Sequence, residues 1–308
     1  MFSLVWIFHI SGLFFHIARL NSAKAGLYFV IHKKDYGDLI MKGICFIGAG
    51  KMATAIAAGL VGKKMQYSIH AYDPNPKAAQ TFAETTGGTV YDSPVKALEN
   101  AEIILLAVKP QHLAEAVAAF RKQIGNRLVI SIVAGVPIAS LQNLTGSARI
   151  VRVMPNTPAL VGEGMSCIAP APGASAEDAD TVASLLSSVG LCRKVAENQL
   201  DAVTGLSGSG PAFVLEFIMA LADGGVYAGL ARDAALELAI QTVLGSAKLA
   251  RDAGKPIGEL RDAVISPAGT TGRGCMELAK GAFAATAAQA VIKAAERSAE
   301  LGKLASGK

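Results

Sequence analysis

The chain has 308 residues, of which 52% are hydrophobic and 17% charged, with a formal net charge of +5. This composition excludes a disordered chain, the length allows two domains with separate cores, and the scattered basic residues argue against a nucleic-acid surface. The four cysteines are far apart and form no Cys-x-x-Cys motif, which favours reduced core cysteines in a cytoplasmic protein. Only His70 and His112 lie beyond residue 40, too few for a zinc cluster or a histidine-based triad, so no metal site is expected.

Residues 1–40 differ from the rest of the chain. Residues 1–18 are almost wholly apolar, but they are at the short end of the ~20 residues that a membrane span requires. They also lack the basic start of a signal peptide. Because Met41 directly precedes the first expected strand, we interpret residues 1–40 as a non-native or poorly ordered extension. A membrane-anchored form is the alternative if residues 1–18 act as an anchor.

The stretch GICFIGAGKMA, residues 43–53, predicts a buried strand, a tight glycine turn and a helix, the order that a dinucleotide-binding fold needs. Gly48 permits the turn, Gly50 lets the backbone approach a pyrophosphate, and Ala53 is small enough for the helix to pack on the strand. The helix N-terminus offers N–H groups and partial positive charge to phosphates. A glycine turn inside any α/β core is the structural alternative, but the strand–turn–helix context favours cofactor binding.

Apolar runs predict the strands that follow, at residues 67–72, 103–108, 128–133, 149–154, 165–169 and 191–195, with a helix at 176–188. Continuous apolar runs of this kind are typical of central parallel strands. The loops after Gly48, Val108, Val133 and Met154 leave carboxyl ends of strands, where ligands bind in open α/β sheets.

Asp73 ends the second strand and has two interpretations. It lies about where an acid would meet the adenosine ribose, and it is equally placed to be a turn residue before Pro74. If Asp73 turns away from the ribose, Asn75 and Lys77 are close enough in sequence to receive a 2′-phosphate.

After about residue 202 the strand patterns give way to alanine-rich helical runs at residues 211–228, 232–253 and 282–301. The first run is apolar nearly all round, so it must be covered on more than one face. A segment of this length cannot cover it alone, and we therefore infer a dimer whose helical domains interlock. Glu216 interrupts the run and argues against a membrane span.

Between these helices, residues 264–274 are dense in glycine, proline and hydroxyl groups. Backbone N–H groups and hydroxyls placed before a helix make an anion site, here ahead of a helical stretch from Met276. An ordinary capped loop is the alternative.

Taken together, the sequence resembles the pyrroline-5-carboxylate reductase family from Met41 to about Leu301. The resemblance rests on five blocks in order: FIGAGKMATAIAAGL (46–60), AVKPQ (107–111), RVMPNTPALVGEG (152–164), GLSGSGPAF (205–213) and SPAGTTGRG (266–274). Ala268 stands where the family usually has glycine, and Cys275 where an aliphatic residue is usual.

The resemblance implies an α/β fold with a Rossmann dinucleotide-binding domain at residues 41–202. A helical dimerisation and substrate domain follows at 203–308, in homodimers that often assemble into rings. It implies hydride transfer from NADPH, with NADH also accepted, to the C=N bond of 1-pyrroline-5-carboxylate, giving L-proline in the last step of proline biosynthesis. The partners are then a small-molecule substrate and a second copy of the chain, without nucleic acid or membrane.

The resemblance also implies the site residues. The cofactor-binding residues are Gly48, Ala49, Gly50, Lys51, Met52, Ala53, Ala107, Val108, Lys109, Pro110, Ala134, Gly135 and Asn156, to which Asp73 is added from its position after the second strand. The substrate-binding residues are Ser266, Gly269, Thr270 and Thr271. We expect the Thr271 hydroxyl to reach the imine nitrogen and to act as the catalytic group.

The residue inventory agrees with that chemistry, because a cyclic imine is easily protonated and needs no strong acid or metal to accept hydride. One alternative is a β-hydroxyacid dehydrogenase, a class that relies on a lysine in the helical domain, for which Lys248 and Lys280 are available. Another is a nucleotide-binding regulatory dimer without catalysis, against which the SPAGTT stretch argues.

Overall fold

The computed structural model describes residues 7–10, 13–16, 30–32 and 41–305. The chain divides into two compact units, Met1–Met41 and Lys42–Lys308. In the first unit, β1 (Ile7–Ile10), β2 (Leu13–His16) and β3 (Val30–His32) form an antiparallel sheet in that order. The sequence patterns did not predict these strands. Most of residues 1–40 lies outside the described residues, and the interpretation of this stretch as an extension stays a prediction.

The second unit contains an eight-stranded sheet in the order β11-β10-β9-β8-β7-β4-β5-β6. Its strands are β4 (Lys42–Ile47), β5 (Tyr67–Tyr72), β6 (Thr89–Val90), β7 (Ile103–Leu106), β8 (Leu128–Ser131), β9 (Ile150–Met154), β10 (Gly164–Pro170) and β11 (Gly190–Lys194). Neighbours pair in parallel except β9 with β10. The strand order reverses between β4 and β7, which creates the switch point where such sheets bind ligands. All the predicted strands are present, and of the strands in this sheet only the two-residue β6 was not predicted.

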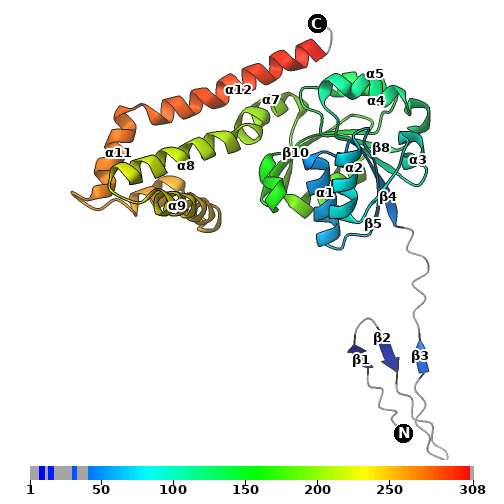
Figure 1. Ribbon diagram of the computed structural model, residues 1–308, viewed down its shortest axis with the longest axis horizontal. Helices are drawn as coiled ribbons and strands as arrows, with labels where there is room; N and C mark the ends of the chain where they lie inside the picture. The colour runs from blue at the N-terminus through cyan, green and yellow to red at the C-terminus, as the bar shows by residue number, and fades with distance from the viewer. Residues whose placement is uncertain (1–6, 11–12, 17–29, 33–40, 306–308) are drawn as a thin grey trace, which may run out of the picture. The chain divides into compact units, whose positions relative to one another are not determined.

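Helices cover both faces of this sheet (Figure 1). One face carries α1 (Lys51–Gly62), α2 (Pro76–Thr86) and α6 (Ala176–Leu186). The other carries α3 (Pro94–Leu98), α4 (Leu113–Ala118), α5 (Ile138–Thr145) and α7 (Leu200–Val203). Alternate residues of β4 enter the two cores, Phe46 on the first face and Ile47 on the second. A strand buried on both faces must be apolar at every position, which is why these strands read as continuous apolar runs.

Short 3-10 turns connect the main elements of the sheet domain. They are η1 (Pro110–His112), η2 (Arg121–Gln123), η3 (Thr157–Val161), η4 (Ser187–Val189) and η5 (Glu197–Gln199). Pro110 begins η1, which leads directly into α4.

The rest of the second unit is helical. From α7 the chain passes through a π-helical turn, Thr204–Gly208, into α8 (Gly210–Tyr227), so the expected domain boundary at 202/203 lies inside a helical run. The helices that follow are α9 (Arg232–Asp252), α10 (Ile257–Asp262), α11 (Thr270–Lys280) and α12 (Phe283–Ala305). The helix expected from Met276 begins earlier, at Thr270, so the glycine-rich stretch at residues 264–274 is half loop and half helix.

The helical domain leaves much of its apolar surface uncovered within one chain. In α8 only Ala222 is buried, while Leu215 is 61% and Met219 56% exposed. In α9 only Ala235 and Ala239 are buried. Because apolar helices of this kind are stable only when covered, this domain requires a partner surface.

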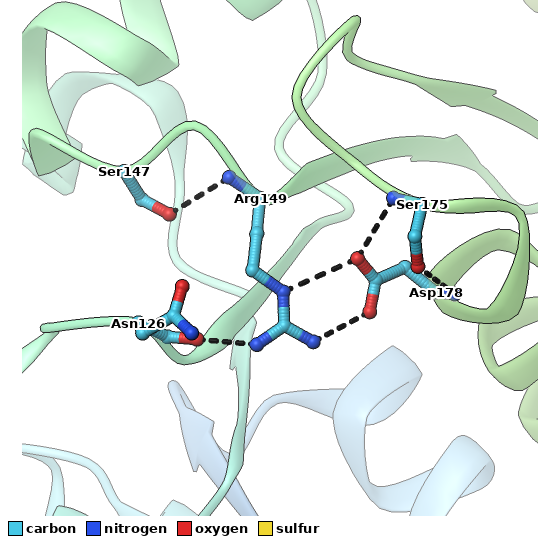
Figure 2. Close-up of polar contacts among 5 residues, drawn as sticks. All are labelled: Asn126, Ser147, Arg149, Ser175 and Asp178. Atoms are coloured by element: carbon cyan, nitrogen blue, oxygen red, sulfur yellow. Dashed lines mark hydrogen bonds and ion pairs between the residues drawn. The ribbon is translucent and has the colours of Figure 1, made fainter.

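A bidentate ion pair joins Arg149, the residue before β9, to Asp178 in the first turn of α6 (Figure 2). The Arg149 guanidinium donates from Nη2 to Asp178 Oδ1 at 2.6 Å and from Nε to Oδ2 at 3.2 Å. The backbone N–H of Ser175 also donates to Asp178 Oδ2, and the Ser175 hydroxyl accepts from the Asp178 N–H, which together form a capping box at the start of α6. The hydrogen bonds from Arg149 lower the pKa of the Asp178 carboxyl, although its burial acts in the opposite direction.

We expect Asp178→Asn to destabilise the fold by ~1–3 kcal/mol at neutral pH, because it leaves a guanidinium without its counter-charge. The lower end of this range allows for water reaching Arg149, whose side chain is 35% exposed. A carboxyl whose folded pKa is lowered stabilises the fold above its unfolded pKa of about 3.9, and this contribution is lost as the pH falls through the folded value. Asp178→Asn should therefore flatten the acid limb of a urea-stability profile. Asp180→Asn, at an exposed acid on the same helix, is the control. It should change neither the stability at neutral pH nor the acid limb of the profile.

Candidate functional site

The glycine turn after β4 has the geometry that a bound pyrophosphate requires. Gly48 has a φ of 98°, and a Cβ there would lie 2.8 Å from the Ala107 carbonyl oxygen, so only glycine fits. At Gly50 a Cβ would meet no atom within 4 Å, which leaves open space in front of the helix. Gly50 is also the N-cap of α1 and contributes no capping side chain, so the first-turn N–H groups face that space. Ala53 is buried in the first core, as its predicted packing role requires.

Asp73 closes this turn from the adjacent strand. Its Oδ2 accepts the Ala49 N–H at 2.7 Å, and its Oδ1 accepts the Asn75 N–H at 2.8 Å. Asp73 is thus a turn residue, whereas the N-cap of α2 is Asn75, whose side chain accepts from the N–H groups of Lys77 and Ala78. The Asp73 carboxylate also lies at the carboxyl ends of the parallel strands, where it lines the cavity described next. Its turn role is therefore compatible with the predicted position near the adenosine ribose.

A cavity of about 550 Å³ opens at the switch point. Six predicted cofactor residues line it: Gly48, Gly50, Asp73, Ala107, Val108 and Lys109. Its remaining wall includes Pro94 at the start of α3 and His112 and Glu115 at the start of α4, which the sequence analysis missed. The sequence could have indicated these residues only by their position, because each follows the carboxyl end of a parallel strand, β6 or β7.

A second cavity of about 500 Å³ lies between α1 and α2 and shares Gly50 and Asn75 with the first. Lys51 and Lys77 line it. The cations and the amide that could receive a 2′-phosphate therefore lie together beside the glycine turn. Met52, in contrast, packs against the first core.

The loop after β8 contains Ala134 and Gly135, two further predicted cofactor residues. Gly135 has a φ of 73°, and its Cβ position would lie 3.8 Å from backbone atoms of Leu301 and Gly302, near the C-terminal end of α12. The last helix of the chain therefore packs against a loop of the sheet domain.

Asn156 ties the sheet domain to the π-helical turn. Its Oδ1 accepts the Met165 N–H at 2.8 Å, and its Nδ2 lies 3.2 Å from the Ser207 carbonyl and 3.3 Å from the Ser207 hydroxyl. Asn156 is a predicted cofactor-binding residue, but its side-chain amide is occupied by contacts within the chain. A π-turn interrupts the regular helical hydrogen bonds, and Asn156 provides a donor to one of its carbonyls. Beside it, a Cβ on Gly205 would lie 2.5 Å from the Val291 carbonyl oxygen of α12, so this crossing also requires glycine.

The predicted substrate residues gather at the start of α11. Gly269 is the N-cap, and its N–H donates to the Ser266 carbonyl at 3.0 Å, so it is not available to a ligand. Thr270 and Thr271 are the first two helical residues, whose N–H groups have no acceptor within the helix. A Cβ on Gly269 would lie 2.2 Å from Ser266 Oγ, so glycine is needed for the Ser266 side chain to sit beside the helix start.

One chain does not bring the two sets of residues together. Figure 1 shows α11 packed on α12 at the end of the helical domain that points away from the sheet. Lys280 at the end of α11 donates to Glu277 at 2.6 Å, and both side chains are exposed. Within the described residues, no group of three or more His, Cys, Asp or Glu side chains is placed to hold a metal ion.

Family models match both halves of the second unit. A model for pyrroline-5-carboxylate reductase dimerisation matches residues 197–301, and one for coenzyme F420-dependent NADP oxidoreductase matches residues 43–135. Among curated proteins, the pyrroline-5-carboxylate reductase of Arabidopsis thaliana is 44% identical over 265 residues, 84% of this chain and 95% of that protein. The Methanosarcina acetivorans enzyme is 45% identical over 267 residues, 84% of this chain and 98% of that protein.

Solved structures show the same similarity. A pyrroline-5-carboxylate reductase from Coxiella burnetii superposes with a TM-score of 0.81 at 30% identity, covering 85% of this chain and 99% of that one. The Plasmodium falciparum pyrroline carboxylate reductase with NADP bound gives a TM-score of 0.76 at 32% identity, covering 85% and 98%.

Ala268 is the residue of the Ser266–Thr271 turn that departs from glycine, and its φ of 58° lies in the left-handed region. An L-residue there costs roughly 1–2 kcal/mol relative to glycine, so Ala268→Gly should stabilise the protein by about 1 kcal/mol. Ala263→Gly is the control: this exposed residue has a φ of −64°, and its substitution should lower stability. Denaturant unfolding of both variants at one protomer concentration tests this, and an equal loss in both would contradict the strain at Ala268.

Proposed function

The chain belongs to the pyrroline-5-carboxylate reductase family, and from that membership we propose how its residues divide the work of the reaction. The enzyme reduces the C=N bond of 1-pyrroline-5-carboxylate to give L-proline, the last step of proline biosynthesis, with NAD(P)H as reductant. The observation that carries this conclusion is identity above 40% to curated reductases over more than four fifths of the chain. The direct test is loss of NADPH absorbance on adding 1-pyrroline-5-carboxylate, together with no formation of NADPH when a β-hydroxy acid is mixed with NADP.

The residues of the sheet domain fit a dinucleotide. The left-handed turn at Gly48, the open space before Gly50 and the uncapped N–H groups of α1 suit a pyrophosphate, and the adjoining cavity is large enough for part of a nucleotide. When bound, the cofactor supplies the hydride. The protein holds the nicotinamide end of the cofactor at the loops after β7 and β8, which contain Val108 and Gly135.

The substrate is a small ring with one carboxylate and one imine nitrogen. We assign the carboxylate to the N–H groups of Thr270 and Thr271, assisted by the Ser266 hydroxyl, because the start of α11 presents these donors together with a partial positive charge. The Thr271 hydroxyl, which has no hydrogen bond within the described residues, is assigned to the imine nitrogen. Holding both groups converts the reaction into one between pre-oriented partners.

This assignment requires two chains. Since α11 of one chain lies away from the carboxyl ends of its own strands (Figure 1), the substrate residues reach a glycine turn only when a partner chain is added. The dimerisation family model covers the same helices whose apolar faces are exposed, which supports a homodimer. We propose that the two helical domains interlock across these faces, and that such dimers assemble further into rings in the cytoplasm.

By length and composition alone, the helical run Glu197–Tyr227 is the one described helix that could cross a membrane, with a mean hydropathy of 1.4. We assign its apolar surface to the dimer and not to lipid, because Glu216 lies in the middle of α8 and Asp223 pairs with Arg232 near its end. The two alternatives raised by the sequence, a β-hydroxyacid dehydrogenase and a non-catalytic regulatory dimer, are set aside by the family match.

Cofactor preference should depend on Asp73. The Asp73 carboxylate should repel the 2′-phosphate of NADPH, since two like charges ~4 Å apart in water repel by ~1 kcal/mol. Asp73→Ser should therefore raise the ratio of kcat/KM for NADPH over NADH about fivefold. The ratio is the quantity to measure, because loss of the bonds to Ala49 and Asn75 weakens the turn for both cofactors alike. Asp92→Ser, an exposed acid paired with Lys96, is the control. An unchanged ratio would show that Asp73 lies off the ribose.

Thr271→Val keeps the shape of the side chain but removes the hydroxyl. Loss of one such hydrogen bond costs ~1–3 kcal/mol, so kcat/KM should fall roughly 5- to 150-fold, while NADPH binding and thermal stability stay close to wild type. Thr271→Ser should be milder, and Thr89→Val on the exposed edge strand β6 is the matched control. Full activity in Thr271→Val would make the hydroxyl a structural group only.

A further inference from the structure

An acidic residue at the entry to the helical domain is bonded to two elements of the sheet domain. Glu197, the first residue of η5, accepts the Ile138 N–H at 2.6 Å and lies 3.1 Å from Arg152 Nη1, both through the same carboxylate oxygen. These partners are 59 and 45 residues away in sequence. Glu197 therefore joins the start of α5, the middle of β9 and the start of the helical domain at one point.

The bond to Ile138 replaces a missing helix cap. The N-cap of α5 is Pro137, which has no side-chain acceptor, and Ile138 is the first helical residue. A carboxylate at this end satisfies an N–H group that the helix cannot, and it also interacts favourably with the helix dipole. Glu197 thus fixes where α5 begins, and with it the end of the loop formed by residues 132–137.

The bond to Arg152 neutralises a charge inside the sheet domain. The Arg152 side chain is only 11% exposed, and its residue lies in register between Ser131 of β8 and Ala169 of β10. A buried guanidinium without a counter-charge is strongly unfavourable, so Glu197, at 36% exposure, is held in place by that requirement. The pair is consequently an anchor for the loop and not a mobile surface contact.

The same loop is bounded on its other side by α12. Backbone atoms of Leu301 and Gly302 lie 3.8 Å from the Cβ position of Gly135, at the turn of the loop. The loop that the proposed function assigns to the nicotinamide end is therefore held between the domain junction at Glu197 and the last helix of the chain.

We propose that Glu197 is a positioning residue of the reductase: through Ile138 and Arg152 it holds the loop at residues 132–137 in the geometry that orients the nicotinamide. In this role Glu197 acts through its contacts to Ile138 and Arg152, and not by direct contact with cofactor or substrate. The inference rests on the proposed function for the role of that loop. A displacement of ~1 Å at the reacting groups is enough to lower a rate ~100-fold, so a residue that sets this loop has a measurable effect on turnover.

The test compares Glu197→Ala with Glu197→Gln in the full-length dimer. The alanine variant removes both contacts, whereas glutamine keeps an oxygen that accepts the Ile138 N–H. We expect Glu197→Ala to weaken NADPH binding in a fluorescence titration and to lower kcat/KM for NADPH ~10- to 100-fold, with the KM for 1-pyrroline-5-carboxylate little changed. Glu197→Gln should recover part of this loss, because its amide oxygen keeps the contact to Ile138 but does not neutralise Arg152. Glu177→Ala, an exposed acid on α6, is the control and should behave as wild type.

Two results would overturn the proposal. One is wild-type NADPH affinity and kcat in dimeric Glu197→Ala, with only the melting temperature lowered. The other is an equal loss of turnover in both variants with unchanged NADPH affinity, which would show that Glu197 only neutralises Arg152 and does not position the loop. Because the titration needs no substrate, it decides the role of Glu197 even if wild-type protein fails to reduce 1-pyrroline-5-carboxylate, a failure that would count against the proposed function instead.

Discussion

At Gly48 the chain leaves β4 with a φ of 98°. It passes so close to the end of the neighbouring strand β7 that a Cβ on Gly48 would lie 2.8 Å from the Ala107 carbonyl oxygen. This contact places β4 and β7 side by side at the point where the strand order reverses. It also sets where α1 begins, and therefore where its uncapped N–H groups point. The Asp73 carboxylate holds the same turn from the other side through Ala49. The proposed cofactor site therefore depends on one close backbone approach that only glycine permits.

The two domains of the second unit solve the burial problem differently. The sheet domain fills two cores of its own, one on each face of the sheet. The helical domain has a small core around Ala222, Ala235 and Ala239, and its large side chains remain exposed in one chain. A second chain must therefore complete the hydrophobic core. In the proposed homodimer, the same contact brings a partner's α11 within reach of a sheet domain. Assembly and catalysis then depend on the same surface.

Sequence periodicity predicted the main strands and long helices, because their apolar patterns are local and uninterrupted. β5 was predicted at its observed bounds, but α3, α5 and β6 are too short for a period to emerge. The roles of Gly48 and Gly50 could be predicted because glycines between a strand and a helix are typical of a dinucleotide-binding turn. The turn role of Asp73 was one of its two predicted interpretations, although its bond to Ala49 was not predicted. The contacts of Asn156 and Glu197 could not be predicted, since each depends on partners brought together by the fold from positions far along the chain. The start of α11 at Thr270 was missed because glycine and threonine are poor helix formers that tertiary context overrides.

Among the helices of the described residues, two begin after a glycine, α1 after Gly50 and α11 after Gly269, and neither has a capping side chain. By contrast, α2 and α6 are capped by Asn75 and Ser175, which satisfy their own first-turn N–H groups. A side-chain cap and a bound anion compete for the same donors, so a helix that binds an anion is better without the cap. α9 and α10 also begin without a side-chain cap, after Ala231 and Pro256, so α1 and α11 are distinguished by the glycine that precedes them. The reaction has two anions to place, a pyrophosphate and a carboxylate, and we assign them to these two helix starts. Since the imine needs orientation more than it needs acid catalysis, the relative position of these two helix ends in the dimer is what the rest of the fold has to maintain.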